Sequence, residues 1–279
     1  MGRELRATFD EDAERYDRAR PHYPVTLFDD LVELAHLSPG SRVLEIGCGT
    51  GQATVPLAAR GCSVVAVELG ANLAAVARRN LAPFPNTEVV VGSFEEWPLP
   101  REAFDAVVAF TAFHWVDPDV GLAKVADALR PGGAFVTVMT DHVAGGTAPF
   151  FVESQDCYER WDPDTPAGLR LAAPETVVSD AAPDPLGRFG PSELRRYEAD
   201  IAYTTDAYID VLLTYSGHRA LDDERRIGLL SCIASLIDTR YGGMIVKHYL
   251  WRLRASTRMD NVRAWTQPKS SSPLNRSNS

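Results

Sequence analysis

Lysine is scarce in this chain. Of the 28 basic residues only Lys124, Lys247 and Lys269 are lysines, and arginine supplies the rest. Acidic residues outnumber basic ones by 38 to 28, which gives a formal net charge of −10. An acidic surface repels phosphate backbones, and the chain has no basic tract, so we expect no nucleic-acid partner.

Cysteine is also scarce, and long apolar runs are absent. Cys48, Cys62, Cys157 and Cys232 show no spacing typical of a metal or redox site, so we expect no metal ion and reduced thiols. The N-terminal stretch MGRELRATFDEDAERYD is charged throughout, unlike a signal peptide. No segment approaches the ~18 apolar residues of a membrane helix. We therefore expect a cytoplasmic protein that does not associate with membranes.

The composition is that of a globular protein, with 45% hydrophobic and 24% charged residues among 279. Short apolar segments alternate with amphipathic ones. The predicted strands are 42–46, 63–67, 87–91, 104–110, 134–139, 197–203 and 244–254. The predicted helices are 4–20, 25–35, 51–60, 71–80, 119–129, 207–213 and 222–238. Most strands are uniformly apolar, which is typical of a parallel sheet covered on both faces.

The expected fold class is therefore α/β, a doubly wound, mostly parallel seven-stranded sheet. The last predicted strand alternates apolar and polar residues, which indicates a half-exposed antiparallel strand at the end of the sheet. The predicted divisions are an N-terminal helical segment 1–37, a core 38–140, a lid-like insertion 141–195, the C-terminal part of the sheet 196–265 and a disordered tail 266–279.

The strongest motif is the glycine-rich sequence VLEIGCGTG at 43–51, in which a strand runs into a turn that opens a helix. A nucleoside triphosphate would require GxxxxGK[ST], and the lysine is missing. A dinucleotide would require GxGxxG, and Gln52 stands at the third glycine. The remaining class is S-adenosylmethionine, whose loop reads [E/D]xGxGxG.

Two acidic residues favour the same ligand. Glu45 lies two residues before Gly47, where a carboxylate suits a ligand that carries an ammonium and a sulfonium. Glu68 lies 21 residues after Gly47, close to the ~20-residue distance at which an acid binds ribose hydroxyls. Its carboxylate can accept two hydrogen bonds from the 2′- and 3′-hydroxyls.

Beyond these motifs, residues 9–140 resemble the class I S-adenosylmethionine-dependent methyltransferases of the bacterial small-molecule, natural-product tailoring type. The resemblance rests on the segment FD…YD…RPHYP at 9–24, FDAVV at 104–108, FHW at 113–115 and LRPGG at 129–133. It implies S-adenosyl-L-methionine as cofactor, with the core 38–140 as the cofactor-binding part.

The resemblance also implies roles for single residues. The loop glycines would lie near the methionine part of the cofactor, Glu68 on the ribose and Arg20 on the carboxylate. Ser93 stands where many members have aspartate, so the backbone N–H and ring of Phe94 would contact adenine. The implied cofactor residues are Arg20, Tyr23, Glu45, Gly47, Cys48, Gly49, Gly51, Glu68, Leu69, Ser93, Phe94, Phe110 and Thr111.

Methyl transfer to a small-molecule N, O or C atom by in-line displacement needs alignment and an aromatic lining, and a hydroxyl acceptor also needs a base. The candidate catalytic residues are His114, Tyr16 and Phe113, with His142 as a further base. The candidate substrate residues are Phe9, Trp115, His142, Tyr158, Trp161 and Tyr215, with His218 beside them. The alternatives are a nucleic-acid or protein methyltransferase and a non-catalytic cofactor-binding module. The apolar stripe of the first helix covers either its own pocket or a neighbour in a homo-oligomer.

Overall fold

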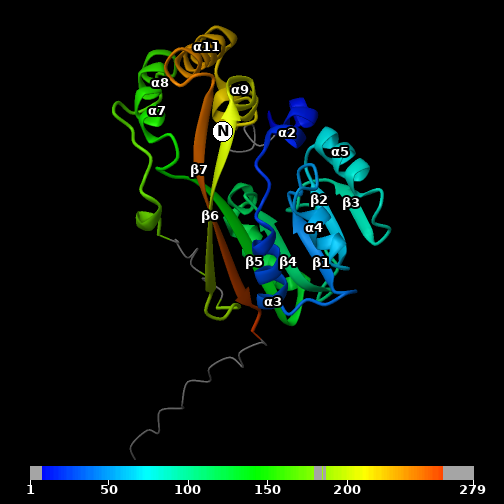
Figure 1. Cartoon of the computed structure of the whole chain (residues 1–279). Helices are drawn as coiled ribbons and strands as arrows, with labels where there is room; N and C mark the ends of the chain where they lie inside the picture. Colours follow the sequence, from blue (N-terminus) through cyan, green and yellow to red (C-terminus); the bar gives the residue numbers. More distant parts are fainter. Residues whose placement is uncertain (1–7, 179–183, 185–186, 260–279) are drawn as a thin grey trace, which may run out of the picture.

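In the computed structural model, which describes residues 8–178, 184 and 187–259, seven strands form one sheet in the order β3-β2-β1-β4-β5-β7-β6 (Figure 1). The strands are β1 (Arg42–Ile46), β2 (Ser63–Glu68), β3 (Thr87–Val91), β4 (Phe104–Phe110), β5 (Leu129–His142), β6 (Glu193–Thr204) and β7 (Met244–Thr257). Strands β1 to β5 are parallel, and β7 runs antiparallel to both of its neighbours. The predicted doubly wound, mostly parallel sheet is confirmed. The edge strand beside β7 is β6, whereas the sequence prediction placed the last strand, β7, at the end of the sheet.

Helices connect the strands and extend beyond the sheet. They are α2 (Ala13–Ala19), α3 (Val25–Leu34), α4 (Thr54–Ala59), α5 (Ala71–Leu81), α6 (Pro118–Ala128), α7 (Ala148–Glu153), α8 (Gln155–Trp161), α9 (Thr205–Leu212), α10 (Ser216–Ala220) and α11 (Asp223–Arg240), with 3-10 turns η1 (Thr8–Asp12), η2 (Phe113–Trp115) and η3 (Pro174–Thr176).

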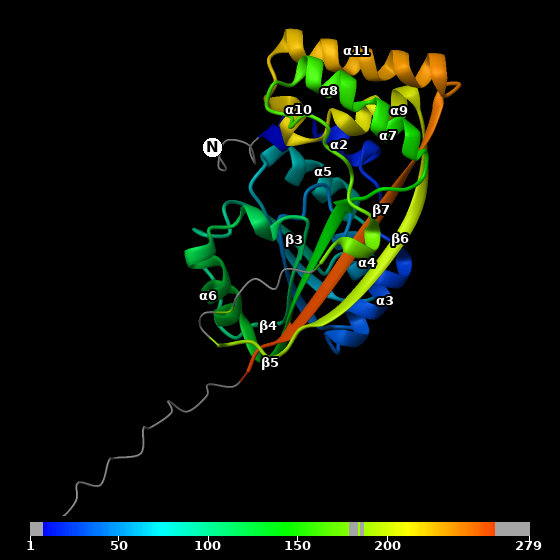
Figure 2. The ribbon, with the colours of Figure 1, turned by 90° about the vertical axis from the view of Figure 1, so that its left-hand side faces the viewer.

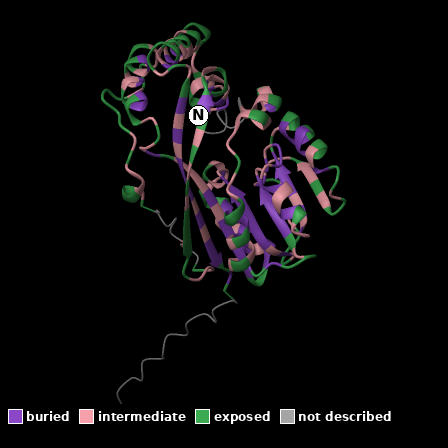
Figure 3. Cartoon of the chain, viewed as in Figure 1, coloured by how far each residue is buried: buried purple, intermediate pink, exposed green. Residues whose placement is uncertain are grey.

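The sheet is covered on both faces, as its apolar strands require. On one face α3 and α4 bury Phe28 and Leu57 against Val43 of β1. On the other face α6 buries Val125 against Leu44. Figure 3 shows the resulting buried strands between the outer helices. Because successive side chains of a strand point to opposite faces, Val43 and Leu44 belong to different layers of the core.

Several element boundaries differ from the sequence prediction, and two of the differences have a clear structural cause. The described part of the predicted helix 4–20 is divided into η1 and α2, because the side chain of Asp12 accepts a hydrogen bond from the Arg15 N–H and caps α2. The expected turn before the fifth strand lies inside β5 as an irregularity. There Leu129 pairs with Phe104 and Ala134 with Ala106, so the residues between them loop out. The predicted disordered tail lies outside the described residues.

A helical cap, formed by α7 to α11, lies beyond the carboxyl ends of β5 and β6 (Figures 1 and 2). It comes from two segments of the chain, one after β5 and one between β6 and β7. Cys157 of α8 and Cys232 of α11 form a disulfide with an S–S distance of 2.06 Å. This corrects the expectation that all four thiols are reduced, since the cap brings together two cysteines 75 residues apart. None of the helices in the described ranges is long and apolar enough to cross a membrane.

Candidate active site

The glycine loop follows β1 directly and lies against the end of β4. Gly47 has a φ of 68°, and a Cβ atom built there would lie 2.7 Å from the Cβ of Ala112. Gly49 has a φ of 57°, and the ring of Tyr16 lies 3.4 Å from the position of its Cβ. A side chain at either position would have an unfavourable backbone conformation, and at Gly47 it would also be too close to Ala112. The loop therefore requires glycine for its conformation at both positions and for space at Gly47.

Glu68 at the end of β2 is held by the same loop. Its two carboxylate oxygens accept hydrogen bonds from the N–H groups of Gly49 at 2.8 Å and Gly70 at 2.9 Å. The side chain is buried, and desolvation raises its pKa above the ordinary value, although both N–H groups oppose that shift. Each oxygen keeps a second lone pair, so the carboxylate can still accept hydrogen bonds from a ligand.

A cavity of about 320 Å³ opens beside this loop, between the carboxyl ends of β1 and β4. In doubly wound sheets ligands bind at this position, where the strand order reverses. Most of the residues predicted to bind cofactor or acceptor line it. They are Phe9, Tyr16, Arg20, Gly47, Gly49, Glu68, Leu69, Ser93, Phe94, Phe110, Thr111, His114, Trp115, His142 and Tyr215. Within the described ranges no group of three or more metal-ligating side chains gathers.

Five of the residues predicted for cofactor binding or catalysis do not line this cavity. They are Tyr23, Glu45, Cys48, Gly51 and Phe113. Glu45 is the most informative, because its buried carboxylate accepts a hydrogen bond from the Thr54 hydroxyl of α4 at 2.6 Å. Desolvation, with a smaller contribution from the nearby Glu68, raises the pKa of Glu45 to about 7. In this position Glu45 can act on a ligand through its charge but not by direct contact.

Two predicted acceptor residues lie in the cap. Tyr158 lines a second cavity of about 210 Å³ that shares His142 and Tyr215 with the large one. Trp161 lines neither cavity. Its indole packs on α11 at Gly228, where a Cβ atom would come within 2.4 Å of the ring. The position of Trp161 is explained by the packing of α8 on α11.

Arg20 points into the large cavity from the chain that follows α2. It donates a hydrogen bond from Nη2 to the carbonyl oxygen of Thr214 at 2.7 Å, and its guanidinium lies 4.9 and 4.7 Å from the ring centroids of Tyr16 and Tyr215. Its Nε is buried and has no hydrogen-bond partner within the described part of the chain. A buried N–H without an acceptor is unfavourable, so this guanidinium is suited to an anionic group in the cavity.

Thr111 follows β4 with a φ of 50°, which is rare for a β-branched residue and costs roughly 1–3 kcal/mol. The conformation is held by a hydrogen bond from its N–H to the carbonyl oxygen of Val138 at 2.7 Å and by a hydroxyl contact with Thr140 at 3.1 Å. Strain of this kind is common at functional sites. Here it places residue 111 on the wall of the cavity.

The two candidate bases occupy different places. His114 in η2 lines the large cavity, and desolvation lowers its pKa. His142 at the end of β5 lies where the two cavities meet, and solvent reaches its ring there. Desolvation by the surrounding protein, and then the charge of Lys247, lowers the pKa of His142 to about 3. Both imidazoles are therefore neutral at neutral pH.

Sequence reasoning missed Glu95, which lies two residues after Ser93 and lines the large cavity. Its carboxylate accepts hydrogen bonds from the Ser93 hydroxyl at 2.6 Å and from the Asp117 N–H at 3.3 Å. Ser93 and Glu95 together therefore present a carboxylate in the region of the cavity wall where Ser93 by itself would present only a hydroxyl. The signal in the sequence was an acid just beyond the expected position, in the segment after β3.

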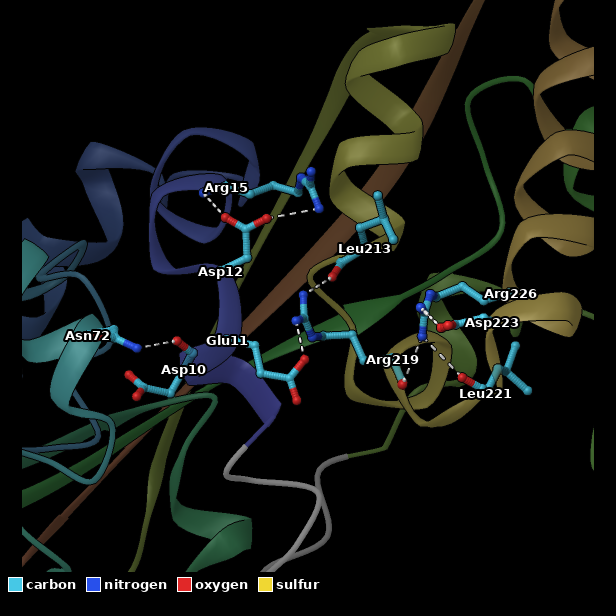
Figure 4. A network of polar contacts seen from close by, with 10 residues as sticks. All are labelled: Asp10, Glu11, Asp12, Arg15, Asn72, Leu213, Arg219, Leu221, Asp223 and Arg226. Atoms are coloured by element: carbon cyan, nitrogen blue, oxygen red, sulfur yellow. Dashed lines mark hydrogen bonds and ion pairs between the residues drawn. The ribbon is translucent and has the colours of Figure 1, made fainter.

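The N-terminal helical segment joins the core to the cap across the large cavity. Figure 4 shows the Asp10 carbonyl accepting from Asn72 of α5, and Glu11 paired with Arg219 of α10. Arg15 adds an ion pair of 3.0 Å with Asp210 of α9. The apolar stripe packs on Leu73 and Val76 of α5. The segment therefore covers the pocket of its own chain, and its apolar stripe packs within that chain.

Comparisons with known proteins agree with this geometry. A family model described as a methyltransferase domain matches residues 44–137. An uncharacterized methyltransferase of Mycobacterium tuberculosis is 40% identical over 131 residues, which cover 47% of this chain and 51% of that protein. An uncharacterized methyltransferase of Geobacillus sp. strain WCH70 is 32% identical over 145 residues, which cover 49% and 67%.

A solved structure from Anaeromyxobacter dehalogenans, described as a candidate type II methyltransferase, is 25% identical with a TM-score of 0.59. The match covers 86% of this chain and 97% of that one. The alignment spans about half the length of the Mycobacterium tuberculosis relative. The chain belongs to the class I S-adenosylmethionine-dependent methyltransferases, and the cofactor of this family is S-adenosyl-L-methionine.

Proposed function

We propose that this protein transfers the methyl group of S-adenosyl-L-methionine to a small-molecule acceptor. The observation that carries the proposal is the arrangement of Glu68 and the glycine loop at the switch point of the sheet. A buried carboxylate there faces a cavity large enough for a nucleoside and keeps free lone pairs for a ribose diol.

The residues around the cavity fit the parts of this cofactor. Glu68 would accept hydrogen bonds from the ribose hydroxyls, and the guanidinium of Arg20 would pair with the carboxylate of the methionine part. Glu95 would accept from the adenine amino group, with Leu69 and Phe94 beside the ring. When bound, the cofactor supplies an electrophilic methyl group on a sulfonium. The protein supplies alignment, aromatic surfaces and the exclusion of water.

Several residues of the chain suit the acceptor side of this reaction. Phe9, Tyr16 and Trp115 form an aromatic wall in which ring centroids lie 6.0 to 6.2 Å apart. His114 is neutral and can take a proton from a hydroxyl acceptor, whereas an amine acceptor needs only to arrive uncharged. A place in secondary metabolism is part of the proposal and is supported only by the resemblance of residues 9–24 to natural-product tailoring enzymes.

The alternatives fit less well. A nucleic-acid or protein acceptor would need an open mouth, and here the N-terminal helical segment joins core and cap over the cavity. A non-catalytic module would have no space beyond the cofactor, and the second cavity supplies such space. The formal net charge of −10 argues further against a nucleic-acid acceptor.

Isothermal titration with S-adenosylhomocysteine tests the proposal. We expect wild-type protein to bind it and Gly49→Val to lose binding, because a valine at a φ of 57° would also meet Tyr16. The matched control is Gly242→Val, which has a φ of 64° and no atom within 4 Å of its Cβ position. If Gly49→Val binds as tightly as Gly242→Val, the loop does not hold the cofactor. Turnover is then measured with labelled cofactor against small-molecule and macromolecular acceptors.

A further inference from the structure

The second cavity forms an inner chamber beneath the cap, distinct from the space beside the glycine loop. It has a volume of about 210 Å³ and adjoins the large cavity at His142 and Tyr215, which line both. Its walls come from β5, α7, α8, α9, α10 and β7 and from the segment that follows α8. They consist of His142, Phe151, Ser154, Gln155, Tyr158, Thr165, Leu169, Leu171, Tyr208, Leu212, Tyr215, His218 and Lys247.

Lys247 of β7 is the unusual member of this wall. It is only 4% exposed, yet no hydrogen bond or ion pair to it is found among residues 8–178, 184 and 187–259. Its Nζ lies 4.6 Å from the ring centroid of Phe151 and 5.5 Å from that of Tyr249. These cation–π contacts recover only part of the hydration lost on burial. Desolvation accordingly lowers the pKa of Lys247 to about 8, which leaves it mostly charged at neutral pH.

No second charge balances Lys247 inside the inner chamber. None of the residues that line it is an aspartate or a glutamate. Burial lowers the pKa of His142 to about 3 and that of His218 to about 4, so both rings are neutral. The His218 Nε2 and the Tyr158 hydroxyl lie 3.0 Å apart and form a neutral hydrogen-bonded pair. The inner chamber therefore carries one uncompensated positive charge in a largely apolar and aromatic wall.

We propose that the inner chamber binds the carboxylate of a small, largely apolar methyl acceptor, with Lys247 as its charge partner. The identification of this ligand as an acceptor depends on the proposed methyl transfer, whereas the carboxylate site does not. One lysine balances one carboxylate. A phosphate, with a charge of about −1.5 to −2 at neutral pH and three strong acceptor oxygens, would be left mostly unpaired.

The arrangement of the two cavities indicates how this acid would be oriented when bound. Phe151, Leu212 and Tyr208 offer apolar surface next to Lys247, which suits the body of an aromatic or branched acid. Since the inner chamber meets the large cavity at His142 and Tyr215, an acid anchored at Lys247 would extend its other end towards the cofactor space. Lys247 is thus a specificity-determining residue that selects anionic acceptors.

Benzoate and its neutral counterpart benzamide test this site in protein saturated with S-adenosylhomocysteine. Binding of each probe is followed by NMR up to millimolar concentrations at neutral pH. We expect wild-type protein to bind benzoate about tenfold or more tightly than benzamide, because the amide cannot pair with the ammonium. Lys247→Met keeps the length and apolar stem of the side chain and should abolish this preference.

The matched control is Arg225→Met, which removes a positive charge from the exposed surface of α11 in the cap and should leave the preference unchanged. The wild-type comparison needs no variant, so a folding defect in Lys247→Met does not prevent a decision. The proposal is overturned if benzoate does not bind, if benzamide binds equally well, or if Lys247→Met keeps the preference. Titration of S-adenosylhomocysteine into each protein before the probes are added separates the two proposals, since failure of this titration would overturn methyl transfer, and benzoate binding to the ligand-free protein would then test the carboxylate site by itself.

Discussion

Replacing Glu68 with glutamine tests the proposed ribose contact most directly. In the structure the two carboxylate oxygens accept from the Gly49 and Gly70 N–H groups, at 2.8 and 2.9 Å, and each keeps a lone pair for a hydroxyl. Glutamine keeps one side-chain oxygen as an acceptor, but its NH₂ group cannot accept a hydrogen bond from an N–H group or a hydroxyl. One charge-assisted hydrogen bond is thereby lost, which is worth about 1.5–3 kcal/mol. The dissociation constant of S-adenosylhomocysteine should rise about 10- to 150-fold.

The assay is isothermal titration with two nucleosides beside S-adenosylhomocysteine. Wild-type protein should bind adenosine more tightly than 2′,3′-dideoxyadenosine, and Glu68→Gln should reduce that difference, because the diol has lost its partner. Glu88→Gln makes the same change at an exposed position of the neighbouring strand β3 and should alter neither value. If Glu68→Gln weakens both nucleosides equally, the residue supports the loop and does not bind the ribose.

Three further predictions follow from buried charges and the disulfide. Folded Glu45 has a pKa of about 7, above its ordinary 4.5. The free energy of unfolding should therefore fall by about 3 kcal/mol as pH rises between these values, and Glu45→Gln should remove that part of the pH dependence in urea titrations. Arg20→Met should weaken S-adenosylhomocysteine about tenfold or more but spare 5′-methylthioadenosine, which lacks the carboxylate, and equal weakening would contradict the assigned role. Thiol titration of unfolded, unreduced protein should find the thiols of Cys48 and Cys62 alone. Replacing Cys157 and Cys232 with alanine should lower the free energy of unfolding by about 2–4 kcal/mol, as judged by chemical denaturation.

The sequence predicted the sheet well because the signals for it are local. Each apolar run became a strand, and the alternation in 244–254 correctly indicated an antiparallel strand, β7. The bounds were less accurate where a tertiary contact decides them. The β5 irregularity depends on Leu129 pairing with Phe104, and the start of α2 depends on the capping side chain of Asp12.

The candidate site likewise has one part that local motifs predicted and another part, in the cap, that they did not. Motifs at the carboxyl ends of β1 and β2 predicted Gly47, Gly49 and Glu68 on one wall, and the structure places them there, because neighbouring parallel strands end at the same edge. The cap has no such motif. The Cys157–Cys232 pair and the inner chamber depend on how α8 and α11 pack, which no short stretch of sequence encodes.

Lys247 shows how much signal was nevertheless present. In β7 it shares one face of the strand with Ile245, Tyr249 and Trp251, whose side chains are buried. A lysine on the apolar face of a strand departs from the pattern, and such departures are concentrated at functional positions. Lysine is also rare in this chain, but the sequence prediction assigned no role to Lys247.

Buried groups of opposite charge lie at the two ends of the adjoining cavities. Glu45 and Glu68 lie beside the space that a cationic cofactor would occupy, and desolvation raises the pKa of both carboxyls, so a positive ligand there would stabilise their ionised forms. Lys247 lies at the other end, where an anion would stabilise its charged form. If this polarity serves binding, each ligand should shift the pKa of the groups at its own end. S-adenosylmethionine, added to protein with ¹³C-labelled glutamate, should lower the pKa of Glu45, whereas benzoate should raise that of Lys247 observed through ¹³C-labelled lysine. If the pKa values of Glu45 and Lys247 do not change when ligand is added, these charged groups have no role in ligand binding.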